Sequence, residues 1–412
     1  MASTNAKWQY RDGWWLALLV CIGLALRATV IASYSHTIES DELAYRSMAS
    51  NLLGGKGVVD NMGNYAMYNV GYPLFVLAPT FFAFGDSILA ARIFNAVLGG
   101  LSITLCYALA SAAGAGRVGK LLAAGIWALY LPASIYSVYL LKENLMVPLI
   151  LAVMWCALRF QKAPSGWLAA GCGLLFGMIA LSGNAALSMV AAVMIAVLLA
   201  PMSIRQRLGH AALILLVASA VVAPWMIRNM HAIGAPVLNT NSGFNLYLGN
   251  NPAATGMFVS IKDTPRGESW ESLRKTGEVL ASETLKNEAI TWITENPSTF
   301  VSLALKKAAY FWTPPLHEGK GKQSTAEKAV RLMWVLQFLA LAAAALGSLT
   351  MTRLRNQQLL ILWLAITGYT AVHMLFYVIF RYREPIMPIV GIIAALVLES
   401  LIVRWRERTP SP

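Results

Sequence analysis

The sequence predicts an all-α polytopic membrane protein with about ten transmembrane helices. Of its 412 residues, 58% are hydrophobic and only 12% are charged, and a soluble domain cannot bury so much apolar surface. Lys and Arg outnumber Asp and Glu by 32 to 19, and most of the basic residues stand in short clusters between apolar runs. This is the positive-inside pattern of a polytopic membrane protein, and it argues against nucleic-acid binding.

The apolar runs alternate with loops of two kinds. Every loop assigned to the cytoplasmic side carries at least two basic residues, so the topology is consistent along the chain. Lys7 and Arg11 precede the first run, which predicts an uncleaved signal anchor with a cytoplasmic N-terminus; the C-terminus is expected on the same side. The predicted spans are residues 14–33, 87–110, 121–140, 145–160, 166–182, 185–200, 210–227, 328–350, 358–378 and 386–403.

The loop after the first span, residues 34–84, is expected outside the cytoplasm. Its residues 41–53 can form an amphipathic helix. Residues 70–84 are apolar but short, and Pro73 and Pro79 interrupt them. They are therefore predicted to form a re-entrant or interfacial segment rather than a span.

Residues 229–325 form the only sizeable polar region of the chain. A helix is predicted at about 268–294. An amphipathic segment at 298–312 is expected to lie against the membrane, with Lys306 and Lys307 at its polar edge. The sequence thus divides into an N-terminal transmembrane module that includes the first loop (1–228), the extracytoplasmic loop region (229–325) and the C-terminal helices (326–412).

Two adjacent carboxylates, Asp41 and Glu42, follow the first span directly. One interpretation is structural, with Ser40 as the N-cap of a helix whose first turn carries negative charge, which suits the helix dipole. The other is chemical, because a carboxylate at the membrane surface can act as a general base. The choice depends on what else lies on the same side of the membrane.

The topology brings several polar features to that side. Carboxylates are suited to proton chemistry, cations to holding a phosphate, and a Gly/Asn loop to offering backbone donors. Each feature also has a structural interpretation, as a surface ion pair, an arginine at a helix end or a tight turn. The features are Asp41-Glu42, Lys142-Glu143, Arg228-Asn229, the loop 248–256 with Asn250 and Asn251, and Arg381-Tyr382-Arg383.

Taken together, these segments resemble the C-type superfamily (GT-C) of membrane glycosyltransferases, the group with protein O-mannosyltransferases and lipid A aminoarabinose transferases. The stretch Asp41–Tyr45 resembles the acidic motif of the family's first extracytoplasmic loop, and Gly71–Leu74 resembles its proline-leucine segment. Arg381–Pro385 resembles its closing motif. One departure is Val70–Pro73, where many relatives have two prolines preceded by His or Lys, so a basic residue that can help bind phosphate is missing there.

The resemblance implies a GT-C fold and an inverting transfer of a sugar from a polyprenyl-phosphate carrier. The acceptor would be a glycan, lipid or protein at the periplasmic face of a bacterial inner membrane. No cofactor is expected, because the Asp-Glu pair is too sparse to predict a metal although some relatives use one. The implied roles are general base for Asp41 with Glu42 and Glu143 as alternatives, phosphate binding for Lys142, Arg228, Arg381 and Arg383, and substrate contacts for Tyr45, Tyr72, Asn250, Asn251 and Tyr382.

Three other functions stay open at this point. A transporter or flippase of lipid-linked sugars would be expected to show ionisable residues or broken helices near mid-membrane, in two related halves. An O-antigen ligase or polymerase would carry its essential residues in one large loop, which the early acidic motif argues against. A non-enzymatic scaffold of envelope assembly would tolerate loss of the acidic and basic residues.

Overall fold

The computed structural model describes residues 2–314 and 324–408. These residues form helices and connecting loops without any strand, apart from an isolated β-bridge between Met257 and Val378. The all-α prediction is therefore confirmed. Residues 315–323 of the predicted loop region and 409–412 of the predicted C-terminal segment lie outside the described part of the chain.

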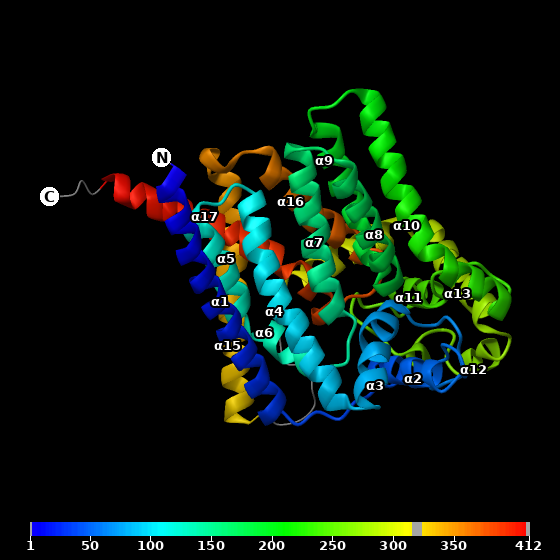
Figure 1. Ribbon diagram of the computed structural model, residues 1–412. Helices are drawn as coiled ribbons and strands as arrows, with labels where there is room; N and C mark the ends of the chain where they lie inside the picture. Colours follow the sequence, from blue (N-terminus) through cyan, green and yellow to red (C-terminus); the bar gives the residue numbers. More distant parts are fainter. Residues whose placement is uncertain (1, 315–323, 409–412) are drawn as a thin grey trace.

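The helices form a bundle whose two ends differ in character. α1 (Ala2–Ser33) begins and α17 (Met387–Arg408) ends at one end, whereas the short helices α2, α3 and α11–α13 gather at the other, which we call the loop end (Figure 1). The bundle also contains α4 (Ile88–Ala112), α5 (Arg117–Leu129), α6 (Leu131–Ile135), α7 (Glu143–Lys162), α8 (Gly166–Ser182), α9 (Met189–Leu199), α10 (Ile204–Ile233), α15 (Thr325–Gly347) and α16 (Gln357–His373).

Six helical segments among the described residues are long and apolar enough to cross a membrane, and α5 with α6, bent by 53°, makes a seventh if counted as one span. The bend lies at the start of α6, whose second residue is Pro132, because proline has no N–H to continue the preceding helix. The remaining predicted spans fall on the shorter helices α8, α9 and α16. All ten predicted spans thus contain helix, but the count of ten is not confirmed.

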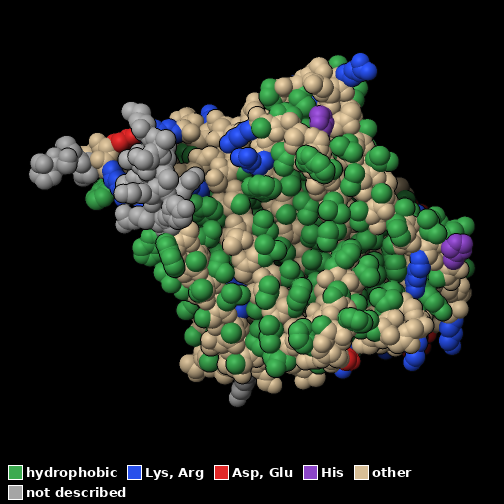
Figure 2. Space-filling model, in the orientation of Figure 1, with side chains coloured by type: hydrophobic (Ala, Val, Ile, Leu, Met, Phe, Trp, Pro, Cys, Tyr) green, Lys and Arg blue, Asp and Glu red, His purple; other side chains and the backbone are tan. Residues whose placement is uncertain are grey.

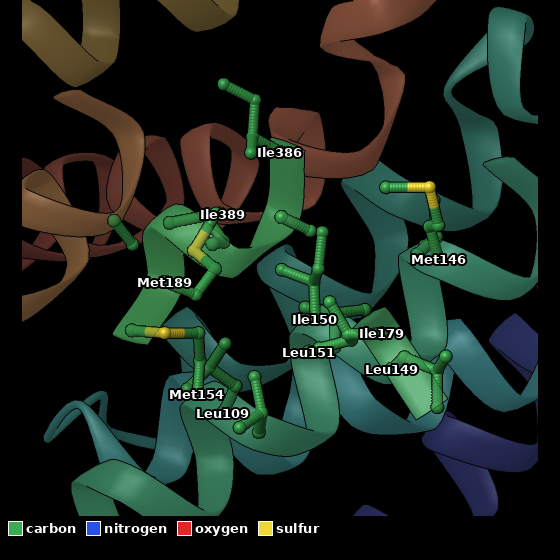
Figure 3. Packing of buried hydrophobic residues seen from close by; sticks show 14 of the residues in the cluster. Leu109, Met146, Leu149, Ile150, Leu151, Met154, Ile179, Met189, Ile386 and Ile389 are labelled. Atoms are coloured by element: carbon green, nitrogen blue, oxygen red, sulfur yellow. The ribbon is translucent and has the colours of Figure 1, made fainter. Parts of the chain in front are cut away.

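The surface and the interior of the bundle fit a membrane protein. A band of hydrophobic side chains covers the visible face, and most of the visible Lys and Arg lie toward its ends (Figure 2). Leucines on α10 and α15 are exposed, as expected of side chains that face lipid. The buried core surrounds α7, where Met146, Ile150 and Met154 pack near Ile179 and Ile389 (Figure 3).

The first loop folds much as predicted at the loop end. α2 (Asp41–Leu53) matches the predicted amphipathic helix. The short apolar segment is helical over Pro73–Phe84, with one π-helical turn (η1, Pro73–Leu77) followed by α3 (Ala78–Phe84). At this length it is too short to cross a bilayer as a helix.

The second polar region differs from the prediction in two places. The helix predicted at 268–294 is divided into α12 (Ser269–Arg274) and α13 (Glu278–Glu295), because Gly277 adopts a φ of 107°, which an α-helix cannot contain. The amphipathic segment forms α14 (Pro297–Phe311). However, Lys307 is fully buried rather than at the polar edge, since its ammonium donates to Asn250 Oδ1 at 3.0 Å.

The two polar regions are joined by a carboxylate of α13. Glu278 accepts hydrogen bonds from the backbone N–H groups of Tyr65 and Ala66 at 2.7 and 3.0 Å, and from the Thr240 hydroxyl at 2.9 Å. Thr240 directly precedes α11 (Asn241–Gly249) and donates its own N–H to the Ala66 carbonyl. The first loop is therefore fixed against α11 and α13, which shapes the site described next.

Candidate active site

Three charged side chains from distant parts of the sequence meet at the loop end. Asp41 and Glu143 are the first residues of α2 and α7, and Arg381 lies in the 3₁₀ segment η7 (Phe380–Ile386). The Arg381 guanidinium contacts the Asp41 carboxylate, and its Nε lies 3.5 Å from Glu143 Oε1. The Asp41 and Arg381 side chains are each 24% exposed, so this pair is accessible to a ligand. The Glu143 side chain is only 3% exposed.

Lys142 completes what we call the charged cluster: Asp41, Lys142, Glu143 and Arg381. Its ammonium donates to Asn69 Oδ1 at 3.3 Å, and it lines a cavity of about 110 Å³ with Glu143 and Tyr382. Burial lowers the pKa of Lys142, while the nearby carboxylates of Glu143 and Asp41 oppose that shift. Two cations thus balance two anions in the charged cluster. Lys142 and Glu143 are its two members that line this cavity, which we call the cluster cavity.

The other wall of the cluster cavity is lined with amides and hydroxyls. Asn69 donates to the Asn184 side chain at 3.1 Å. Asn239 is only 6% exposed, yet neither atom of its side-chain amide has a partner among the described residues. Amides both donate and accept hydrogen bonds, which suits hydroxyl-rich ligands. This wall consists of Asn69, Asn184, Asn239, Asn241, Ser242 and Asn245.

The backbone immediately before Asp41 is strained. Ser40 has a φ of 51°, and it is the only non-glycine residue in the left-handed region within the described part of the chain. Ser40 stands at the N-cap position of α2, with Asp41 and Glu42 in the first turn as the structural interpretation has it, but its side chain makes no capping hydrogen bond. Conformations of this kind cost on the order of 1–3 kcal/mol and persist where the surrounding structure enforces them, often at functional sites.

Two predicted substrate-binding tyrosines border the charged cluster. Tyr382 lies beneath the Arg381 guanidinium, 5.8 Å from ring centre to Cζ, and its hydroxyl donates to the Tyr377 hydroxyl at 3.2 Å. Tyr45 is buried one turn after Asp41 and packs edge-on against Tyr68 and Tyr72. Tyr382 lines the cluster cavity, whereas Tyr45 supports the helix turn that carries Asp41.

Glu42 is not part of the charged cluster, although it is adjacent to Asp41. Its carboxylate accepts the backbone N–H of Leu140 at 2.7 Å and contacts His36 Nε2 at 2.6 Å. The His36 ring in turn lies 4.2 Å from the Tyr139 ring. Glu42 therefore fixes α2 to the segment that leads into α7, and both of its oxygens are occupied by structural contacts.

Two of the predicted phosphate-binding arginines lie elsewhere. Arg228 donates to the carbonyls of Tyr65 and Val58 at 2.8 and 2.5 Å, so it holds the first loop. Arg383 is 2% exposed and donates to the carbonyls of Phe311 and Thr313, which ties η7 to the end of α14. The structure brings together Lys142 and Arg381 but not these two arginines.

The remaining residues predicted to contact substrate form hydrogen bonds within the protein instead. Buried Asn250 donates to the carbonyls of Leu246 and Leu375, and Asn251 donates to the Tyr247 carbonyl, so both stabilise a turn. The Tyr72 hydroxyl donates to Asn95 at 2.9 Å inside the protein.

The structure adds polar residues that the sequence reasoning missed. Arg27 is buried within α1, and it lines a small cavity of about 20 Å³ with Glu143 and Glu384, directly behind the charged cluster. Such a volume is enough for about one water molecule. A lone arginine inside an apolar span was the available signal, because ionisable residues are costly there. For Asn239, the sequence offered no comparable signal.

No group of three or more His, Cys, Asp or Glu side chains within residues 2–314 and 324–408 is arranged to hold a metal ion. The four cysteines are unpaired, and Cys106, Cys156 and Cys172 are buried. Metal independence stays a prediction from the sequence.

Comparison with known proteins identifies the fold. No protein-family model and no curated protein matches the sequence. The structure is similar to the archaeal oligosaccharyltransferase AglB from Archaeoglobus fulgidus, solved with an inhibitory peptide and a dolichol-phosphate, with a TM-score of 0.56 and 14% identity. It is also similar to apo ArnT from Cupriavidus metallidurans, with a TM-score of 0.51 and 15% identity.

These matches cover nearly all of this chain but only part of the known proteins. They extend over 98% of this chain and 52% of AglB, and over 99% of this chain and 62% of ArnT. The chain thus spans about half to three-fifths of the length of the structures that it matches. It shares the overall fold of AglB and ArnT, in agreement with the fold that the sequence resemblance implies.

Proposed function

We propose that the protein is an inverting glycosyltransferase that moves a sugar from a polyprenyl-phosphate carrier to an acceptor hydroxyl or amine. The observation that carries this proposal is the contact of Asp41 with Arg381 beside Glu143 and Lys142, the two members of the charged cluster that line the cluster cavity. The fold supports the class of reaction, and AglB, which shares it, was solved with a dolichol-phosphate.

The charged cluster offers two cations to the phosphate of an anionic donor. Arg381 and Lys142 face Asp41 and Glu143, and a donor phosphate adds a further negative charge. A guanidinium binds phosphate through two parallel hydrogen bonds. When Arg381 exchanges Asp41 for the phosphate, the Asp41 carboxylate is released close to the reacting carbon.

The transfer step can then be carried out by Asp41, Arg381 and Lys142 alone. The acceptor oxygen or nitrogen forms a bond to the anomeric carbon while the bond from that carbon to the phosphate oxygen breaks. Asp41 takes the acceptor proton, and the electron pair of the broken bond stays on the polyprenyl phosphate. Arg381 and Lys142 stabilise the second negative charge that develops there. Attack from the face opposite the leaving phosphate inverts the anomeric centre.

Glu143 is assigned a positioning role. It is buried and reaches the Arg381 Nε, so it fixes the guanidinium whether or not Asp41 is bound. Glu42 has no contact with the charged cluster, because both of its oxygens are engaged by Leu140 and His36. Among the three predicted carboxylates, Asp41 is therefore our choice for the base.

The test is transfer of radiolabelled sugar from synthetic polyprenyl-phosphate sugars, offered one at a time with a membrane extract as the source of acceptor. We expect activity with one donor, reduced by about 10²–10⁴-fold in Asp41→Asn, which is the usual range for loss of a general base. The matched control is Asp86→Asn, since Asp86 is an exposed carboxylate of the same region that pairs with Arg46. This control should retain nearly full activity.

Normal turnover by Asp41→Asn would disprove the assignment of the base. Binding of the same lipids without transfer or hydrolysis, in the presence of a complete extract, would instead favour the flippase or scaffold interpretation.

A further inference from the structure

A second cavity lies next to the cluster cavity at the loop end. Its volume is about 200 Å³, and residues 62–68 form one wall while α11, α12 and α13 form the others. Tyr68 and Thr240 line this cavity, whereas their chain neighbours Asn69 and Asn241 line the cluster cavity. A single layer of chain therefore separates the two cavities. We call the second one the aromatic cavity.

The aromatic cavity combines two rings with a charged rim. Phe244 and Trp270 lie 5.3 Å apart between ring centres, at 51°, and both are half-buried. Glu271 and Arg274 form an ion pair of 3.0 Å beside them, and more than a third of each side chain is exposed. Because this pair is solvent-screened, it contributes little to stability and is available to a ligand.

We propose that the aromatic cavity binds one sugar ring of a glycan acceptor, which places a hydroxyl of the next sugar beside Asp41. This inference rests on the proposed function and specifies its acceptor.

The lining fits a sugar ring in chemistry and in size. A pyranose has an apolar C–H face that packs on an aromatic ring, and hydroxyls along its edge that need donors and acceptors. Phe244 and Trp270 offer the aromatic surface, and Glu271 and Arg274 offer an acceptor and donors. Pockets for drug-sized ligands measure about 300–1,000 Å³, so a cavity of about 200 Å³ suits one ring.

The same wall is unsuited to a peptide acceptor. Peptides that bind by strand addition do so through main-chain hydrogen bonds to free backbone groups. Here the N–H groups of Tyr65 and Ala66 are engaged by Glu278, and the Ala66 carbonyl accepts from Thr240. The cavity thus offers side chains rather than backbone groups.

Tyr68 connects the aromatic cavity to the proposed base. Its ring packs 5.8 Å from that of Tyr45, which lies one turn after Asp41. Burial raises the pKa of Tyr68, and the charge of Asp41 raises it further. A glycan that extends over Tyr68 from the aromatic cavity therefore reaches Asp41.

The test measures binding of sugars without any donor. Saturation-transfer NMR on the purified full-length protein in detergent would use a panel of methyl glycosides of neutral, amino and acidic sugars. We expect magnetisation transfer to one class of glycoside. The affinity for that glycoside should fall at least tenfold in Trp270→Ala and recover in Trp270→Phe. The matched control is Trp167→Ala, an exposed tryptophan at the start of α8 that lines neither cavity.

The outcomes separate this inference from the proposed function. Asp41→Asn should keep the glycoside affinity, and in the transfer assay Trp270→Ala should raise the KM for the acceptor more than it lowers kcat. No saturation transfer to any glycoside would overturn the inference, as would equal affinity in Trp270→Ala. Displacement of a bound glycoside by short peptides would favour a protein acceptor. Glycoside binding that depends on Trp270, in a protein without transferase activity, would leave the sugar site standing and refute the proposed function.

Discussion

At the scale of single residues, Asp41 and Glu42 show that neighbours in one helix turn can serve different purposes. Asp41 contacts an accessible arginine, Arg381, in the charged cluster, whereas Glu42 is buried against Leu140 and His36. Burying a carboxylate is costly unless hydrogen bonds satisfy it, and here both oxygens have partners. The two residues should therefore respond differently to the same substitution.

We expect Glu42→Gln to lower the free energy of unfolding by about 1–3 kcal/mol, because an amide cannot accept at both former oxygen positions. Thermal melting in detergent measures this loss, and transfer activity per folded molecule should stay within a few-fold of wild type. Glu39→Gln is the control, since Glu39 is exposed nearby. A fully stable but inactive Glu42→Gln would show that Glu42, rather than Asp41, is the base.

At the scale of elements, α14 is amphipathic as the sequence predicts, but one of its two adjacent lysines points into the protein. Lys307 is buried and donates to Asn250, whose own amide donates to the carbonyls of Leu246 and Leu375. Lys307 thus joins the Asn250 turn to α14, although its ammonium group is shielded from water. Burial lowers the pKa of Lys307 to about 8.

This shift predicts how stability depends on pH. The pKa of Lys307 is about 8 in the folded protein and 10.5 for an ordinary lysine, so between these values the unfolded chain binds more protons than the folded one. The free energy of unfolding should therefore rise with pH across that window, and the cost of the buried cation is fully present below it. The contribution of Lys307 should vanish in Lys307→Met.

The measurement is the melting temperature of both proteins from pH 7.5 to about 10.5. The exposed neighbour Lys306 provides the control, because Lys306→Met removes the same charge without removing a buried one. A parallel pH dependence in wild type and Lys307→Met would contradict the prediction.

At the scale of the whole molecule, the apolar runs and charged loops predicted the helices and their order, because each signal lies within one stretch of chain. The charged cluster was predicted in part. The positions of Asp41, Glu143 and Arg381 follow from topology, which brings their chain segments to the same end of the bundle. The side chains of Glu42, Arg228 and Lys307 are oriented by partners distant in sequence, such as Tyr65 for Arg228. No local sequence pattern reveals these orientations.

The opposite end of the bundle contains another long-range contact that the sequence does not indicate. Glu399 of α17 accepts the backbone N–H groups of Gly116 and Gly119 at 2.8 Å each, and so caps the start of α5. Carboxylates stabilise helix N-termini through these free N–H groups and the helix dipole. A Cβ on Gly119 would lie 2.5 Å from Glu399 Oε2, so an alanine at this position would displace the carboxylate from its capping position.

A double-mutant cycle tests this contact by a change of sign. Gly119→Ala alone should lower the melting temperature, because the methyl group displaces the capping carboxylate, at a cost of about 1–2 kcal/mol. In the Glu399→Ala background the obstacle is gone, and alanine should then stabilise the helix by up to about 1 kcal/mol over glycine. Gly125→Ala, in the same helix with an ordinary contact of 3.6 Å to Leu19, should be neutral or stabilising in both backgrounds. If Gly119→Ala had the same effect with and without Glu399, the two sites would be energetically independent and the cap would not join the C-terminal helix to α5.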